Sequence, residues 1–173
     1  MIEGSLVRLR SWQETDVPAL MALRNDATLQ AKLLSIALGS DESQVRSWLE
    51  KRTTGKENAF FVIVDTLNDS TIGYIQFTNI DYINQNAELG ICINSSAQGK
   101  GKGTESIKLA LSGYCVINHI YKVGLRVRCD NDNAIRCYER IGFERCGLLK
   151  KHIIIDTQWH DVVLMEYTMK NNS

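Results

Sequence analysis

The stretch Gln98-Gly99-Lys100-Gly101-Lys102-Gly103-Thr104 joins a run of β-forming residues, Ala87 to Ile93, to a helical pattern that continues to about Asn118. Glycines between a strand and a helix let successive backbone N–H groups turn toward one point, and the helix adds the positive end of its dipole. Such a junction suits a phosphate group. We therefore expect an α/β protein that binds an anion at this loop.

Two common phosphate-binding loops do not fit this stretch. The P-loop needs a Gly-Lys-Ser or Gly-Lys-Thr triplet, which is absent here. The dinucleotide fingerprint Gly-x-Gly-x-x-Gly matches Gly99 and Gly101 but meets Thr104 where the third glycine belongs. A third pattern, Gln/Arg-x-x-Gly-x-Gly/Ala, is satisfied by Gln98, Gly101 and Gly103.

A second pattern follows about 30 residues later. The strand Lys122 to Cys129 leads into Asn131, then Asn133-Ala134-Ile135, Tyr138 and Ile141-Gly142-Phe143. This segment resembles the Asn-x-x-Ala-x-x-x-Tyr-x-x-x-Gly-Phe signature of the GCN5-related N-acetyltransferases (GNAT), and the loop resembles the coenzyme A loop of that family. Two motifs in the right order indicate a member of the family, and Arg24-Asn25-Asp26 resembles its ribosomal-protein (RimJ/RimL-like) branch.

The resemblance implies a binding site for acetyl-coenzyme A, with no metal. The backbone of Ile91, Cys92 and Ile93 would pair with the pantetheine arm, which Asn131 would also contact. The N–H groups of one loop would hold the pyrophosphate: Gln98, Gly99, Lys100, Gly101, Lys102, Gly103 and Thr104. The side chains of Lys100 and Lys102 would neutralise coenzyme phosphates.

The implied reaction transfers an acetyl group directly to a primary amine in a ternary complex. An alkylamine has a pKa near that of Lys, ~10.4, so a base must remove a proton at neutral pH. Many relatives of the ribosomal-protein branch carry a Glu in the strand before the loop, where this chain has Glu88; the alternative is a solvent-facing strand residue. Tyr138 would protonate the departing thiolate, although its apolar helical stripe also allows a packing role.

The order of patterns outlines the fold. Ser5 to Arg10 predicts a strand, Asp16 the cap of a helix, and Asp41 with Gln44 the capping box of a second helix. Three further strands precede the loop. A short strand, Phe143 to Cys146, and a closing hairpin follow the helix of the second motif. We expect one domain, residues 1–173, with the GNAT fold: a mixed, mostly antiparallel twisted sheet with helices on both faces.

Composition excludes several classes of function. The chain has 20 basic and 20 acidic residues and a pI near 6.8, so it lacks a broad basic field for nucleic acid. No apolar run approaches the ~20 residues that span a bilayer, and the start lacks the pattern of a signal peptide. Its five cysteines include no Cys-x-x-Cys pair. These features favour a cytoplasmic protein with reduced thiols, and no metal-binding spacing of histidines is present.

The acceptor amine stays open at this level. Arg24 and Asn25 are candidates for acceptor binding, and the acceptor could be a protein N-terminus or a small molecule such as a nucleotide-linked amino sugar. The stretch from Leu29 to Gly39 has no acidic residue, which disfavours a polyamine. An inactive domain that only senses acyl-coenzyme A is a further reading. Because relatives are often dimers, the resemblance also allows a homodimer.

Overall fold

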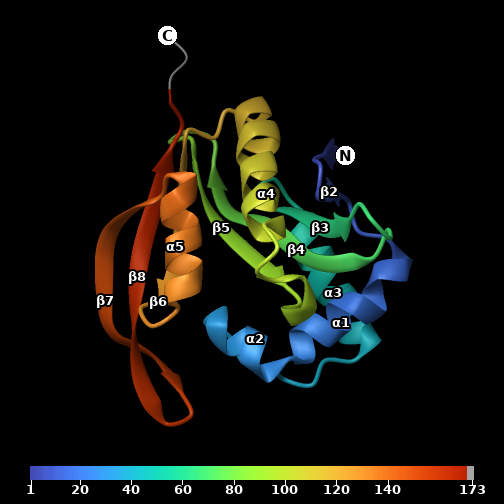
Figure 1. Cartoon of the computed structure of the whole chain (residues 1–173), viewed down its shortest axis with the longest axis horizontal. Coiled ribbons are helices and arrows are strands. Elements are labelled where there is room, and N and C mark those ends of the chain that lie inside the picture. Colours follow the sequence, from blue (N-terminus) through green and yellow to red (C-terminus); the bar gives the residue numbers. More distant parts are fainter. Residues whose placement is uncertain (171–173) are drawn as a thin grey trace.

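The computed structural model describes residues 1–170 of the chain. The last three residues of the predicted domain 1–173 lie outside the described residues. Eight strands form one sheet in the order β1-β2-β3-β4-β5-β6-β8-β7 (Figure 1). All neighbouring strands are antiparallel except β5 and β6, which are parallel. The mixed, mostly antiparallel sheet predicted from the sequence is confirmed.

The elements follow one another along the chain with short connections. The strands are β1 (Ile2–Glu3), β2 (Val7–Arg10), β3 (Ala59–Asp65), β4 (Thr71–Asp81), β5 (Asn86–Ile93), β6 (Lys122–Arg128), β7 (Glu144–Ile155) and β8 (Gln158–Thr168). The α-helices are α1 (Val17–Asn25), α2 (Ala27–Lys32), α3 (Glu42–Thr53), α4 (Lys102–Leu109) and α5 (Asp132–Ile141). No helix within residues 1–170 is long and apolar enough to cross a membrane.

Helices cover both faces of the sheet. On one face, α4 and α5 pack through Ile107 and Ile135 onto a core that includes Phe77 and Val123. On the other face, α1, α2 and α3 pack onto a second core around Tyr74 and Cys92. Alternate residues of the central strands therefore belong to different cores, as the two-residue period of a strand requires.

The two predicted helix caps have different outcomes. The Asp41–Gln44 capping box at the start of α3 is confirmed, with each side chain accepting the backbone N–H of the other residue at 2.8–2.9 Å. Asp16 occupies the N-cap position of α1 as predicted, but its side chain accepts no hydrogen bond from that helix. Its carboxylate instead accepts bonds from Arg10, Thr71 and the Gln13 N–H. Asp16 therefore holds the turn before α1 to the sheet.

The second half of the chain differs from the prediction in two details. The helix after the loop continues beyond α4 as a π-helical segment, Ala110–Cys115. Phe143 to Cys146, predicted as a separate short strand, belongs largely to β7, which forms the long closing hairpin with β8. Gly142, with φ of 115°, ends α5 in the left-handed conformation that allows the chain to turn into β7.

Candidate active site

The parallel strands β5 and β6 separate along their length. Their pairing covers residues 86–88 and 122–124, whereas β5 continues to Ile93 and β6 to Arg128. The separation contributes to a pocket of about 1160 Å³ that is lined by Leu89–Ile93 of β5 and by Arg126 and Val127 of β6. Peptide groups that lose a sheet neighbour are free to hydrogen-bond a ligand. The fold thus provides an extended backbone edge inside a pocket.

Residues from both faces of the sheet line this pocket. The structure brings together Glu88, Tyr138, the Ile91–Ile93 segment, Asn131 and much of the glycine loop. Of the loop, the lining residues are Gln98, Gly99, Gly101, Gly103 and Thr104. Glu88 of β5, the predicted base, and Tyr138 of α5, the predicted acid, therefore line the same pocket. The residues predicted to bind coenzyme A lie beside them.

The glycine loop has the backbone that the sequence indicates. Gly99 and Gly101 have φ of 74° and 77°, a left-handed conformation that glycine adopts without strain. Gly101 is the N-cap of α4, and the Glu105 N–H donates to its carbonyl at 2.9 Å. The N–H groups of the first residues of α4 have no acceptor within the helix. With the helix dipole behind them, they are suited to bind an anion at the wall of the pocket, which is the anion site predicted from the sequence.

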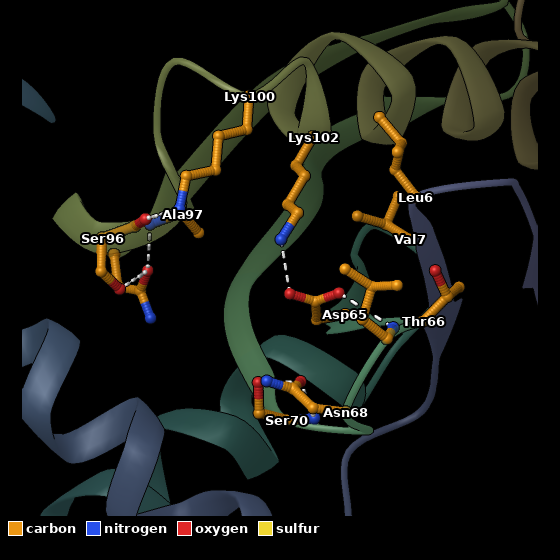
Figure 2. Close-up of polar contacts among 12 residues, drawn as sticks. Leu6, Val7, Asp65, Thr66, Asn68, Ser70, Ser96, Ala97, Lys100 and Lys102 are labelled. Carbon is orange, nitrogen blue, oxygen red and sulfur yellow. Dashed lines mark hydrogen bonds and ion pairs between the residues drawn. The ribbon is translucent and has the colours of Figure 1, made fainter.

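The side chains of the two loop lysines contact other groups of the protein (Figure 2). The Lys102 ammonium is buried and pairs with Asp65 at 2.5 Å. Asp65 therefore already neutralises this ammonium, and its role as a counter-charge for coenzyme phosphate stays a prediction, while the Lys102 backbone N–H belongs to the helix N-terminus. The Lys100 ammonium donates to the Ser96 carbonyl at 2.9 Å and does not line the pocket.

Asp65 and Glu105 both fix the start of α4. Hydrogen bonds from Lys102 and from the Leu67 N–H lower the pKa of Asp65, so its carboxylate stays charged. Glu105 accepts the backbone N–H groups of Ser5, Leu6 and Val7 at 2.7–3.1 Å. The helix that carries the anion site is thus tied to the β2 and β3 side of the sheet (Figure 2).

The α5 side of the pocket carries Asn131, Cys137 and Tyr138. The Asn131 side chain accepts the Ala134 N–H at 3.4 Å and so caps α5. The Tyr138 ring packs against Phe143 at 5.8 Å, and burial raises the pKa of its phenol. Cys137, which the sequence did not single out, lies 3.2 Å from the Thr104 hydroxyl.

The opposite side of the pocket carries Glu88 and a polar residue that sequence reasoning missed. Glu88 is partly buried and pairs across the strands with Thr78, and Gln76 pairs with Gly90. A side chain at Gly90 would meet the Gln76 amide at 3.1 Å, so the glycine leaves the room that this amide occupies. The Gln76 Oε1 is buried and accepts no hydrogen bond within residues 1–170.

Cys92 is a packing residue on β5. Its side chain belongs to the core beneath α1 and α3, beside Tyr74. Burial raises the pKa of this thiol to about 12, so it stays protonated near neutral pH and is a poor nucleophile. Only the backbone of Cys92 is left for the predicted pairing with pantetheine.

Arg24 and Asn25 do not line the pocket. The Asn25 side chain donates to the Ser40 carbonyl and accepts the Ser40 N–H at 2.8 and 2.7 Å, which closes the connection between α1 and α3. Arg24 stacks over Trp48 at 4.4 Å, and its buried Nε finds no partner within residues 1–170. The Asn25 amide is therefore engaged with Ser40, and neither side chain forms part of the pocket wall. Their contact with the acceptor stays a prediction.

The described chain contains no cluster of three or more His, Cys, Asp or Glu side chains that could hold a metal ion. Residues 7–144 match the acetyltransferase (GNAT) domain. Because this match covers most of the chain, the protein belongs to the GNAT acetyltransferase family. Members of this family use acetyl-coenzyme A as the acetyl donor.

The relatives include two kinds of N-acetyltransferase. Spermidine N(1)-acetyltransferase of Escherichia coli is 34% identical over 54% of this chain and 50% of that enzyme. [Ribosomal protein uS5]-alanine N-acetyltransferase of the same organism is 30% identical over 63% of this chain and 57% of that enzyme. The chain thus spans about half the length of the curated spermidine acetyltransferase that it matches.

A solved structure covers nearly the whole chain. Spermidine N-acetyltransferase of Vibrio cholerae, in complex with CoA and spermine, superposes with a TM-score of 0.88. It is 26% identical and covers 95% of this chain and 96% of that one. The predicted GNAT fold is confirmed, and ribosomal-protein acetyltransferases are among the relatives, as the sequence resemblance indicated.

Proposed function

We propose that the protein transfers the acetyl group of acetyl-coenzyme A to a primary amine, in a ternary complex within the pocket between β5 and β6. The observation that carries this proposal is the arrival of Glu88 and Tyr138 at one pocket, beside a glycine loop at the start of α4. Relatives named as spermidine and ribosomal-protein acetyltransferases support amine acetylation. They leave a polyamine, a protein N-terminus and another small amine as acceptor classes.

Acetyl-coenzyme A supplies an acyl group on a thioester, which an unprotonated amine can attack. Glu88, partly buried at the pocket wall, takes the proton of the ammonium group directly or through one water. The backbone edge of Ile91–Ile93 offers N–H donors to the negative charge that develops on the acetyl oxygen. The N–C bond forms as the C–S bond breaks, without a covalent intermediate on the protein.

Tyr138 serves the departing sulfur. Burial raises the pKa of its phenol, which keeps the group neutral and able to donate a hydrogen bond across the physiological range. A thiol has an ordinary pKa of ~8.5, lower than that of a phenol at ~10. Hydrogen-bond stabilisation of the thiolate is therefore easier for Tyr138 than complete proton transfer, and the proton released by the amine completes the thiol.

We further propose that the residues form one catalytic domain that acts in the cytoplasm. One sheet includes strands from both ends of the chain, and all five cysteines are free. Free thiols are typical of a reducing compartment.

The test is release of free thiol from acetyl-coenzyme A in the presence of an amine panel, with wild type beside Tyr138→Phe. The panel contains peptides with varied N-termini, spermidine, and UDP-linked amino sugars. We expect turnover with one acceptor class and a fall in kcat of about a hundredfold for Tyr138→Phe, within the range of acid–base catalysis. The phenylalanine keeps the packing against Phe143, so the acetyl-coenzyme A affinity should be unchanged.

Two results would count against the proposal. If acetyl-coenzyme A raises the melting temperature but no amine is acetylated, the protein is a sensor of acyl-coenzyme A. If acetyl-coenzyme A neither binds nor reacts, the assignment of the pocket is wrong.

A further inference from the structure

Gln76 is a residue of the pocket wall whose side chain carries an unsatisfied acceptor. Its Oε1 is buried without a donor, and its amide lies over Gly90 in the neighbouring strand. A buried carbonyl oxygen without a donor raises the free energy of the folded state, because it has lost its hydrogen bonds to water and has not replaced them. Gln76 lines the pocket. A rotation of the Gln76 amide toward the pocket would let a ligand N–H group donate to this oxygen.

Gln76, Glu88 and Arg126 project from the same face of the sheet. Leu89 of β5 and Leu125 of β6 are buried in the core beneath α4 and α5. Because side chains alternate along a strand, the neighbours Glu88 and Arg126 project from the opposite face. Gln76 pairs with Gly90, two residues beyond Glu88, and shares that face. This is the face that α1, α2 and α3 cover, away from the helix that carries the anion site.

The charged residues of the pocket are mostly basic. Lys32, Arg126 and Arg140 line it together with His152, whereas Glu88 is its one acidic residue within the described chain. Lys32 comes from α2 and Arg126 from β6, and both side chains are exposed. Neither has an ion-pair partner within residues 1–170. A polycation would meet repulsion here, with a single carboxylate to hold it.

We propose that the acceptor is an amine that also carries an anionic group, a phosphate or a carboxylate. The amine binds at Gln76 and Glu88, and the anionic group binds at Arg126 and Lys32. This inference rests on the proposed function and names its substrate class. It assigns the protein a different acceptor class from the relatives named as spermidine acetyltransferases, although the fold is shared.

The test compares four small amines that differ mainly in the group at the far end of the chain. γ-Aminobutyrate ends in a carboxylate, 3-aminopropyl phosphate in a phosphate, butylamine in a methyl group and 1,4-diaminobutane in a second ammonium. We expect kcat/KM of the anionic amines to exceed that of 1,4-diaminobutane by about tenfold or more. The reason is that their terminal group is attracted by Arg126 and Lys32, whereas a second ammonium group is repelled. The two anionic arms show whether phosphate or carboxylate is preferred. The preference should shrink as salt is added.

Two variants test the binding of the anionic end and of the amine end of the acceptor separately. Arg126→Gln should abolish the preference for anionic amines and leave KM for acetyl-coenzyme A unchanged, which also shows that the variant is folded. Gln76→Leu should raise KM for all four amines alike, since it removes the contact to the amine. Lys51→Gln removes an exposed charge at the end of α3, outside the pocket, and should behave like wild type.

Several outcomes would overturn the inference. Faster acetylation of 1,4-diaminobutane or spermidine than of the anionic amines would do so, while leaving the proposed function intact. An unchanged preference in Arg126→Gln would also refute it. If all four amines react too slowly to measure, calorimetry with saturating coenzyme A decides: the inference requires 3-aminopropyl phosphate to bind more tightly than 1,4-diaminobutane. Failure of acetyl-coenzyme A itself to bind would instead refute the proposed function.

Discussion

Glu88 is the residue on which proton removal depends in the proposed reaction. It is partly buried at the pocket wall, and it is the single carboxylate there within residues 1–170. The substitution Glu88→Gln keeps the shape of the side chain and removes its ability to accept a proton. We expect kcat/KM at pH 7 to fall by about 10²–10³-fold, as for other acid–base groups.

The pH dependence distinguishes a base from a residue that only positions the acceptor. An amine with a pKa of ~10 deprotonates itself at high pH. The deficit of Glu88→Gln should therefore shrink between pH 7 and pH 10, measured as kcat/KM by thiol release. A deficit that stays constant over this range would assign Glu88 to positioning.

Asp16 is the residue whose charge matters for stability. It is 2% exposed and accepts hydrogen bonds from Arg10, Thr71 and the Gln13 N–H. Burial alone would raise its pKa, but these bonds together bring the pKa below its ordinary value of 3.8. A depressed pKa in the folded state stabilises the protein above the unfolded pKa, and the gain is lost as pH falls through the folded pKa.

Asp16→Asn should therefore lower the free energy of unfolding by about 2 kcal/mol at pH 7, the scale of hydrogen bonds to a charged group. The difference from wild type should diminish below pH 3.8. Urea denaturation at pH 7 and pH 3 measures both values. Glu14→Gln is the control, since Glu14 pairs with Arg46 on the surface and should change stability little. An equal loss at both pH values would contradict the charge-based account.

At the scale of elements, α4 is held at its N-terminal end by side chains that point away from the pocket. Lys102 pairs with Asp65, and Glu105 accepts N–H groups from Ser5 to Val7. The backbone of the same turn faces the proposed phosphate position. The orientation of the predicted anion site thus depends on the contacts of Lys102 and Glu105 on the side of α4 that faces away from the pocket.

Replacement of Lys102 tests this dependence. We expect Lys102→Met to raise KM for acetyl-coenzyme A several-fold, with a smaller effect on kcat, because the helix N-terminus loses its anchor. Asp65→Asn should cause the same change, although it removes a negative charge. If Lys102 instead contacted phosphate, Asp65→Asn would leave KM unchanged or lower it. Lys100→Met, at the exposed tip of the loop, is the matched control.

The elements of the second half were predictable because their signals are local. The glycine loop, the Asn131 cap and Gly142 act within a few residues, and α5 ends at Gly142 as the sequence indicates. The π-helical segment after α4 has no such local signal. The roles of Lys102 and Asp16 were not predictable in this way, because their partners Asp65 and Thr71 lie 37 and 55 residues away in the chain.

Gln76 was missed for a related reason. In the sequence it is one polar residue of an alternating strand, and nothing distinguishes it from Thr78. Its role becomes apparent only in the structure, where it lies opposite Gly90 in the neighbouring strand and its side-chain oxygen has no hydrogen-bond donor. The mixed sheet followed from the order of predicted elements and from the family resemblance. The order of strands within the sheet and the basic lining of the pocket required the three-dimensional arrangement.

At the scale of the whole molecule, the pocket joins the two faces of the sheet, so a ligand in it bridges both helical layers. Acetyl-coenzyme A that binds only the folded state should raise the free energy of unfolding by ~2.7 kcal/mol at a hundredfold excess over Kd. For a chain of this size, the melting temperature should rise by about 5–10 °C.

Thermal melts with acetyl-coenzyme A and with adenosine measure this stabilisation. Adenosine has no phosphate and should cause no comparable shift, since the anion site at α4 has nothing to bind. A shift of equal size with both compounds would contradict the role of the glycine loop.

The pocket between the separated strands has one wall formed by α4 and α5 and another formed by the layer that contains α2. We expect the donor to bind along the wall formed by α4 and α5 and the acceptor along the wall that contains α2, so that each can bind and leave independently of the other. In steady-state kinetics, this arrangement predicts no compulsory order. Coenzyme A should compete with the donor alone, and the acetylated amine with the acceptor alone.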